Sequence, residues 1–185
     1  MIQPWKLREA ARVIDNGGVI AYPTEAVYGL GCDPLDGAAV NHLLALKGRS
    51  VSKGLILIAS DFSQLSQFVG QLDETQMRPV RESWPGPNTW ILPAAENLPH
   101  WLTGAHATLA VRVTDHPVAA ALCRSSGMAL VSTSANPSGY RPARTALTVR
   151  RFFPTGLDLI VHGPVGPLDR PTRIRDAVNG RMIRA

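Results

Sequence analysis

Short apolar runs alternate along this chain with helix-length segments, and glycine or proline separates most of them, which favours a layered α/β architecture. The spacing of apolar residues predicts a first helix that ends at Gly17-Gly18 and further helices at 37–47, 61–69, 73–82, 116–125 and 145–153. Apolar runs predict strands at 19–22, 55–58, 89–92, 109–113, 130–132 and 159–161. Strands and helices are therefore expected to interleave.

A hairpin is predicted near the end of the chain. Residues 173–178 and 181–184 flank Asn179-Gly180, a dipeptide that tolerates the positive φ angles of a type I′ turn. Because hairpins occur among alternating strands and helices, we predict an α/β fold with a mixed sheet and helices packed on it, not a purely parallel doubly wound sheet. The length and the 45% apolar content fit one globular domain, which we assign to residues 4–185.

Composition excludes several classes of protein. The apolar runs, such as residues 55–59, are far shorter than the roughly 20 residues of a membrane helix, and we expect no signal segment at the start of the chain. The two cysteines, Cys32 and Cys123, stand alone, so their spacing builds neither a disulfide framework nor a metal knuckle. None of the five histidines belongs to a zinc motif. We expect a cytoplasmic protein with no membrane contact and no metal held by its own side chains.

The formal net charge of +5 is concentrated in the last quarter of the chain. Residues 141–185 contain nine arginines and three acidic residues. Such an excess suits a polyanion, either nucleotide phosphates or RNA, because the attraction is long-ranged and independent of sequence. A solvated basic surface with no partner explains the same charge equally well, so charge alone leaves both interpretations open.

Three cations lie close together at the end of one predicted helix. Asp36 is placed to cap the helix at 37–47, and Lys47-Gly48-Arg49 closes it, with Lys53 just before the next strand. A lysine is a compact charge for phosphate oxygens and an arginine offers a planar fork, so the combination suits a triphosphate. The alternative is that these cations only complement the helix dipole.

A run of small polar residues, 132–139, follows the apolar segment at 129–131. Its sequence is Ser-Thr-Ser-Ala-Asn-Pro-Ser-Gly, so Ser132, Ser134 and Asn136 lie where a strand ends. Ligands of open α/β sheets bind beyond the carboxyl ends of strands, and these side chains could hold a nucleotide. The same residues also form ordinary turns, which remains the alternative.

Thr24 lies in a similar place, within Tyr22-Pro23-Thr24-Glu25 after the first predicted strand, and could orient a small polar substrate. The chain has neither a G-x-G-x-x-G nor a G-x-x-x-x-G-K-[ST] motif. Any ATP site in this protein must therefore be of an unconventional kind.

Arg112 interrupts the otherwise apolar strand at 109–113, where an unpaired charge would be costly to bury. It needs an anion. A structural carboxylate such as Asp115 or Asp176 is one candidate, and a carboxylate or phosphate of a substrate is the other.

Five motifs in this order resemble the YrdC-like threonylcarbamoyl-adenylate synthases of the short bacterial type. The motifs are Tyr22-Pro23-Thr24-Glu25, Lys47-x-Arg49 with Lys53-Gly54, Trp84-Pro85-Gly86-Pro87, Ala110-Val111-Arg112-Val113 and Ser132-Thr133-Ser134-Ala135-Asn136. The resemblance implies a twisted open sheet with a concave, positively charged face. It also implies that ATP, L-threonine and bicarbonate are converted to threonylcarbamoyl-AMP and diphosphate for the modification of tRNA, with Mg²⁺ accompanying ATP.

The resemblance further implies roles for individual residues. Lys47 and Arg49 are the expected catalytic residues, and the ATP pocket is expected to contain Lys47, Arg49, Lys53, Ser132, Ser134 and Asn136. Thr24 and Arg112 are expected at the threonine end. Many relatives have Pro-Ser-Thr-Ile where this chain has Pro171-Thr172-Arg173-Ile174, so we assign no contact to Thr172 or Arg173.

The expected partners are the threonylcarbamoyl-transferase machinery that receives the product and, through the basic segment, tRNA itself. Two other functions remain compatible with the sequence. One is a non-catalytic RNA-binding module, suggested by the basic charge. The other is a nucleotide-binding domain like that of carbamoyltransferases, in which YrdC-like domains also occur.

Overall fold

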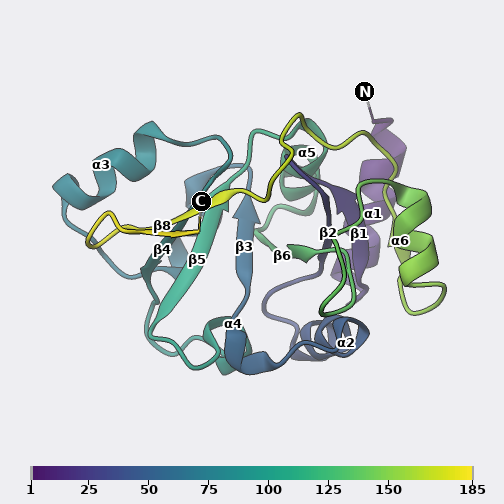
Figure 1. The fold of residues 1–185 in the computed structure, drawn as a ribbon, viewed down its shortest axis with the longest axis horizontal. Coiled ribbons are helices and arrows are strands. Elements are labelled where there is room, and N and C mark those ends of the chain that lie inside the picture. The colour runs from purple at the N-terminus through teal and green to yellow at the C-terminus, as the bar shows by residue number, and fades with distance from the viewer. Residues whose placement is uncertain (1, 185) are drawn as a thin grey trace.

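The computed structural model describes residues 2–184, and in this part of the chain it shows a nine-stranded mixed sheet with helices packed on it (Figure 1). The strand order is β7-β1-β2-β6-β3-β5-β4-β8-β9. The sheet combines three parallel pairs (β1–β7, β3–β5 and β4–β8) with antiparallel ones, so the predicted mixed α/β class is confirmed. The expected domain end at Ala185 lies outside the described residues.

The strands are β1 (Ile20–Pro23), β2 (Tyr28–Gly31), β3 (Ile56–Ala59), β4 (Asn88–Pro93), β5 (Thr108–Val113), β6 (Leu130–Ser134), β7 (Leu159–Ile160), β8 (Arg173–Asp176) and β9 (Met182–Arg184). The helices are α1 (Pro4–Asp15), α2 (Gly37–Lys47), α3 (Glu74–Glu82), α4 (His100–Thr103), α5 (Pro117–Ser126) and α6 (Ala146–Phe152), with short 3₁₀ turns at Val51–Lys53, Phe62–Gln64 and Ser66–Phe68. Among residues 2–184, no helix combines the length and the apolar character needed to cross a membrane.

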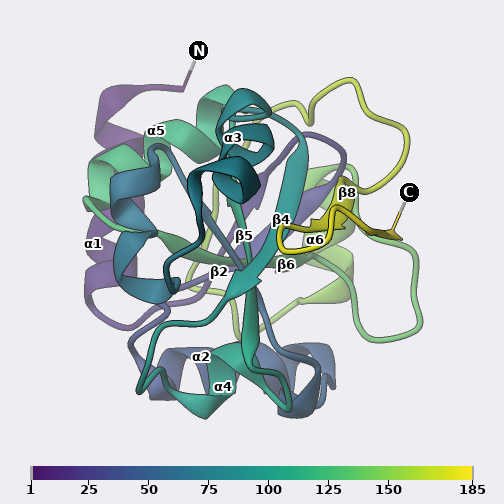
Figure 2. The same cartoon turned by 90° about the vertical axis from the view of Figure 1, so that its left-hand side faces the viewer.

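Two apolar cores lie on opposite faces of the sheet. On one face α1 packs against α5 (Figures 1 and 2). Ile14 and Leu122 from these helices belong to the same buried core as Ile58 of β3. On the other face the larger core joins Leu43 of α2 to Leu57 of β3 and to residues of the remaining strands. Neighbouring residues of β3 therefore point into different cores, which explains why nearly every residue of this strand is apolar.

Strand β2 was not predicted, because Tyr-Gly-Leu-Gly lacks a clear strand pattern. Packing requires glycine at position 31. A Cβ atom on Gly31 would collide with the carbonyl oxygen of Val131 and would lie 2.8 Å from the ring of Tyr22. Close approach of neighbouring backbones therefore places glycine in this strand, against its local propensity.

The predicted helix at 61–69 is wrong, since this segment forms two 3₁₀ turns. Its polar side chains bond the local backbone: Asp61 accepts from the amide of Ser63 at 2.8 Å, and Gln64 accepts from that of Ser60 at 3.0 Å. Such bonds compete with the α-helical ladder. Leu65 and Phe68 remain buried, so the apolar pattern was read correctly but assigned to the wrong element.

The C-terminal hairpin is confirmed as β8 and β9, but its turn is not of type I′. Gly180 has a positive φ of 72°, whereas Asn179 is not among the residues with positive φ. The loop is longer than two residues, and Asp176 caps it by accepting hydrogen bonds from the amides of Val178 (2.8 Å) and Asn179 (3.3 Å).

Replacing Asp36 with alanine should destabilise the protein by about 1 kcal/mol, because its side chain caps α2 by accepting from the amides of Ala38 (2.9 Å) and Ala39 (3.0 Å). Asp36→Asn keeps a capping oxygen and should lie within a few tenths of a kcal/mol of the parent. Urea unfolding of the two variants measures the difference. Equal stabilities would contradict the capping role.

Candidate functional site

Two turns that are far apart in the sequence meet at the end of α2. We call residues 47–53 the cation turn and residues 132–139 the polar turn. The ammonium of Lys47 donates to the carbonyl oxygens of Ser134 and Asn136, the latter at 2.8 Å. In return, Ser138 donates from its amide to the carbonyl of Lys47 (2.8 Å) and from its hydroxyl to that of Gly48 (3.0 Å). The polar turn is thus fastened to the end of the helix.

Local sequence explains why Lys47 points this way. Gly48 ends α2 in the left-handed conformation with φ of 57°, and the amide of Arg49 then closes on the carbonyl of Leu44 at 3.0 Å. Lys47 is only 4% exposed. Burial, and secondarily the charge of Arg49, lowers the pKa of its ammonium to about 8.

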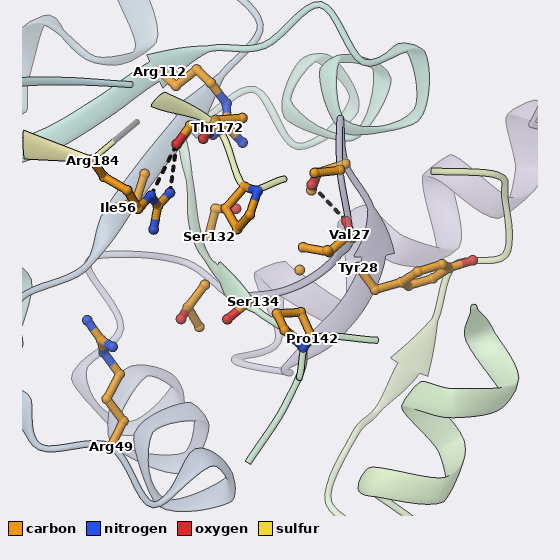
Figure 3. A pocket seen from close by; sticks show the side chains of 15 residues that line it. Val27, Tyr28, Arg49, Ile56, Arg112, Ser132, Ser134, Pro142, Thr172 and Arg184 are labelled. Atoms are coloured by element: carbon orange, nitrogen blue, oxygen red, sulfur yellow. Dashed lines mark hydrogen bonds between the residues drawn. The ribbon is translucent and has the colours of Figure 1, made fainter. Parts of the chain in front are cut away.

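A cavity of about 300 Å³ opens beside the polar turn and is bounded by the β1–β2 turn, β2, β5, β6 and segments near the C-terminal end of the chain (Figure 3). We call it the main cavity because most of the candidate residues line it, although it is not the largest cavity of the molecule. Figure 3 shows Arg49 at one side of it, Arg112 and Arg184 at the other, and Ser132 and Ser134 between them. Its lining comprises Thr24, Ala26, Val27, Tyr28, Gly29, Arg49, Ile56, Arg112, Ser132, Thr133, Ser134, Pro142, Pro171, Thr172 and Arg184. Hydroxyl groups and guanidinium groups therefore share one concave surface.

Arg112 is held in a buried network at one end of the main cavity. Its Nη2 lies 3.1 Å from Oε2 of Glu25, and both side chains are 5% exposed. Its Nη1 donates to the hydroxyls of Thr89 (3.1 Å) and Thr172 (2.8 Å). The structural carboxylate is therefore Glu25, neither Asp115 nor Asp176, because the turn between β1 and β2 brings Glu25 against β5.

Arg49 and Arg184 face the same cavity with part of their hydrogen-bonding capacity free. Arg49 donates from Nη2 to the carbonyl of Gly54 (3.0 Å), while its buried Nε has no partner within residues 2–184. Arg184 donates from Nε (3.2 Å) and Nη2 (2.8 Å) to the carbonyl of Thr172. Burial lowers the pKa of both guanidinium groups, for Arg184 with a smaller effect of Arg112, yet arginine stays charged at neutral pH.

A side cavity of about 330 Å³ adjoins the main one and shares Arg49, Ile56 and Arg184 with it. Its lining includes the polar residues Lys53 and His106 and the apolar residues Ile91 and Ala110. Because the two cavities share lining residues, a ligand could extend from one into the other, and we call the two together the groove.

The candidate residues divide into three groups. Five of the eight line the main cavity, namely Thr24, Arg49, Arg112, Ser132 and Ser134. Lys53 lines the side cavity. Lys47 and Asn136 are among the lining residues of neither cavity, because their side chains bond backbone carbonyls instead. Nδ2 of Asn136 donates to the carbonyls of Pro137 (3.0 Å) and Tyr140 (2.8 Å).

Sequence reasoning assigned no role to several residues that the fold brings to this site: Glu25, Thr89, Thr172 and Arg184. Glu25 is part of the motif Tyr22-Pro23-Thr24-Glu25, but no local sequence pattern indicates that it pairs with Arg112. For Arg184 the sequence predicted a place in the C-terminal hairpin but no contact with a ligand. These contacts join strands that are distant in the chain, so no spacing rule could find them.

The arrangement suits a ligand with anionic groups at two places. Three guanidinium groups and several hydroxyls can neutralise and orient phosphate and carboxylate oxygens, and they do so on a scaffold already fixed by backbone contacts. The cavity offers positioning and charge neutralisation more than proton transfer.

Proteins of known family resemble nearly the whole chain. Residues 12–185 match the Sua5/YciO/YrdC family model, whose description is "Telomere recombination". A protein of Halorhodospira halophila named threonylcarbamoyl-AMP synthase is 54% identical over 182 residues, which cover 98% of this chain and 95% of that protein.

Solved structures agree with the fold. Sua5 of P. abyssi complexed with L-threonine matches with a TM-score of 0.91 at 33% identity, covering 98% of this chain and 54% of Sua5. This chain therefore spans about half the length of Sua5. YciO of E. coli matches with a TM-score of 0.84 at 28% identity, covering 95% of this chain and 85% of YciO.

Replacing Lys47 with methionine should lower the free energy of unfolding by about 1–3 kcal/mol, because the carbonyl of Asn136 loses its buried donor. Lys53→Met is the matched control. Lys53 is exposed, so its replacement should change stability by less than about 0.5 kcal/mol. Chemical denaturation measures both, and equal effects would mean that the Lys47 contacts contribute nothing specific.

The lowered pKa of Lys47 predicts a pH dependence of stability. Below about pH 8 the side chain is protonated in both the folded and the unfolded chain. Between about pH 8 and the ordinary lysine value, the unfolded chain holds a proton that the folded protein has released, so the free energy of unfolding rises with pH. The difference between the parent and Lys47→Met should be larger by about 1–2 kcal/mol at pH 9.5 than at pH 7.5. A constant or shrinking difference would contradict this.

Proposed function

The chain belongs to the Sua5/YciO/YrdC family, and we propose that it is a threonylcarbamoyl-AMP synthase that uses ATP, L-threonine and bicarbonate. The name of the Halorhodospira relative, which matches almost from end to end at 54% identity, supports this activity. Sua5, whose structure contains L-threonine, supports the amino-acid substrate. The observation that carries the proposal is a single cavity lined by Arg49 of the cation turn, the serines of the polar turn and the buried Arg112.

In this proposal ATP lies along the groove formed by the two cavities. Arg49 and Lys53 neutralise the phosphates, and the hydroxyls of Ser132 and Ser134 orient the nucleotide. Mg²⁺ enters with ATP as part of the substrate complex, coordinated by phosphate oxygens and water. Lys47 and Asn136 contribute without lining the cavities, because they fix the backbone of the polar turn and Lys47 adds a positive charge.

L-Threonine occupies the opposite end of the main cavity. Its carboxylate pairs with Arg112, whose Nε has no partner among residues 2–184, and Thr24 contacts its polar side chain. The two substrates thereby approach each other near Ser132 and Ser134, which lie between Arg49 and Arg112 (Figure 3). Such an arrangement converts an encounter of separate molecules into a reaction within one complex.

The proposed reaction has two steps. The neutral amine of threonine adds to carbon dioxide formed from bicarbonate, losing a proton, and gives an N-carboxylate. An oxygen of this carboxylate attacks the α-phosphorus of ATP in line, and the bond to the bridging oxygen breaks with release of diphosphate. The product is a mixed anhydride. The protein supplies positioning and charge neutralisation, which is sufficient for such a transfer.

The short-lived carbamate requires protection from water until it is adenylated. We propose that the concave shape of the main cavity provides this protection. The product then passes to threonylcarbamoyl-transferase machinery that modifies tRNA. We propose that the protein acts in the cytoplasm together with this machinery. Exposed arginines of the last quarter of the chain, such as Arg150, Arg170 and Arg173, give a basic surface for contact with tRNA.

Replacing Arg49 with alanine should reduce threonine-dependent release of diphosphate from ATP by about 10- to 1000-fold, as expected when a preorganised cationic donor is lost. Arg150→Ala, an exposed arginine on α6, serves as the control and should keep the parent rate. The assay contains ATP, L-threonine and bicarbonate without tRNA. Salt-dependent RNA binding by a parent protein with no turnover would instead favour a non-catalytic RNA-binding module.

A further inference from the structure

A chain of buried polar groups lies behind Arg112 and ends outside the main cavity. The amide of His116 donates to the hydroxyl of Thr114 at 3.2 Å, and this hydroxyl donates to Oε1 of Glu25 at 2.5 Å. The other oxygen of Glu25 lies 3.1 Å from Nη2 of Arg112. Thr114, Glu25 and Arg112 are each 6% exposed or less, so each of these contacts is shielded from water.

Glu25 does not line the main cavity. It lines a separate, largely apolar cavity of about 880 Å³ between the start of α1, the start of α5 and residues 162–167. The carboxylate of Glu25 therefore stands in the wall between two cavities, with Arg112 on the substrate side. The carboxylate is in contact with one charged side chain that lines the main cavity, Arg112.

The hydrogen bonds of Arg112 indicate how its contact with Glu25 affects the guanidinium group. The guanidinium carries five N–H bonds. Two of them, on Nη1, point to Thr89 and Thr172, and Nη2 has one contact, with Glu25. Without Glu25 the group would be held on Nη1 alone and could pivot about that nitrogen, which would turn the remaining donors away from a ligand.

We propose that Glu25 and Thr114 are positioning residues, which hold the Arg112 guanidinium in the orientation that receives the carboxylate of the amino-acid substrate. The assignment rests on the proposed function for the identity of that substrate. Thr114 orients the carboxylate of Glu25, and Glu25 in turn fixes Nη2 of Arg112. A side chain misplaced by about 1 Å can cost a large factor in a positioned reaction, so the effect should be visible in kinetics.

A purely structural role for Glu25 makes a different prediction. If the carboxylate only neutralised a buried charge, its loss would lower stability but would leave Arg112 freer to pair with the substrate. The threonine KM would then stay the same or fall. The positioning role predicts that it rises while the ATP KM stays constant.

The test compares Thr114→Val with Thr114→Ser in the diphosphate-release assay. Valine keeps the branched shape but removes the hydroxyl that holds Glu25, whereas serine keeps the hydroxyl. We expect Thr114→Val to raise the threonine KM about 3- to 10-fold, with the ATP KM and kcat within about two-fold of the parent. Thr114→Ser should restore the parent threonine KM.

Glu25→Ala should have the larger effect, a rise in threonine KM of about 10-fold or more. If that variant does not fold, the valine and serine pair at position 114 decides alone. Asp115→Asn is the matched control, since Asp115 is exposed, lines the same apolar cavity as Glu25 and makes no contact with Arg112. It should behave as the parent.

An unchanged or lowered threonine KM in folded Thr114→Val, an equal rise in the ATP KM, or failure of serine to restore the parent value would overturn the inference. Failure of the proposed function would give a different result: the parent protein itself would release no threonine-dependent diphosphate.

Discussion

The ammonium of Lys47 joins two turns that are separated by more than eighty residues, and the shape of the candidate site depends on this contact. The carbonyls of Ser134 and Asn136 accept its hydrogen bonds, and Ser138 returns two bonds to the end of α2. Because these hydrogen bonds to backbone carbonyls hold the cation turn against the polar turn, Arg49 and Ser134 line the same cavity. The lowered pKa of the ammonium shows that its burial has an energetic cost, which its two acceptors offset.

The second constraint is the buried pair of Arg112 and Glu25. A charge inside a sheet is tolerated when a partner of opposite charge and further hydrogen bonds satisfy it, and here Thr89, Thr114 and Thr172 supply those bonds. The pair joins the turn after β1 to the central strand β5. At both ends of the main cavity, therefore, a buried cation joins segments that are distant in the sequence: Arg112 at one end and Lys47 beside the other.

Local patterns predicted much of the fold, because helix caps and apolar periodicity act within a few residues. The helix at 37–47 with its Asp36 cap is confirmed, as is the strand over 109–113, whereas the strand at 28–31 required a close backbone approach that only the folded sheet reveals. Resemblance of motifs indicated the family, and Arg49 and Ser134 do share a cavity. The pairing of Glu25 with Arg112 lies beyond such reasoning, since it depends on how two loops and a strand pack.

The central claim is that the cation turn and the polar turn converge on one nucleotide, with the amino acid at the Arg112 end of the same cavity. A crystal structure of the protein with a non-hydrolysable ATP analogue and L-threonine tests it most directly. Phosphates beside Arg49, with the threonine carboxylate on Arg112, are the predicted result. A nucleotide bound elsewhere, for example in the apolar cavity beside His116, would contradict the account.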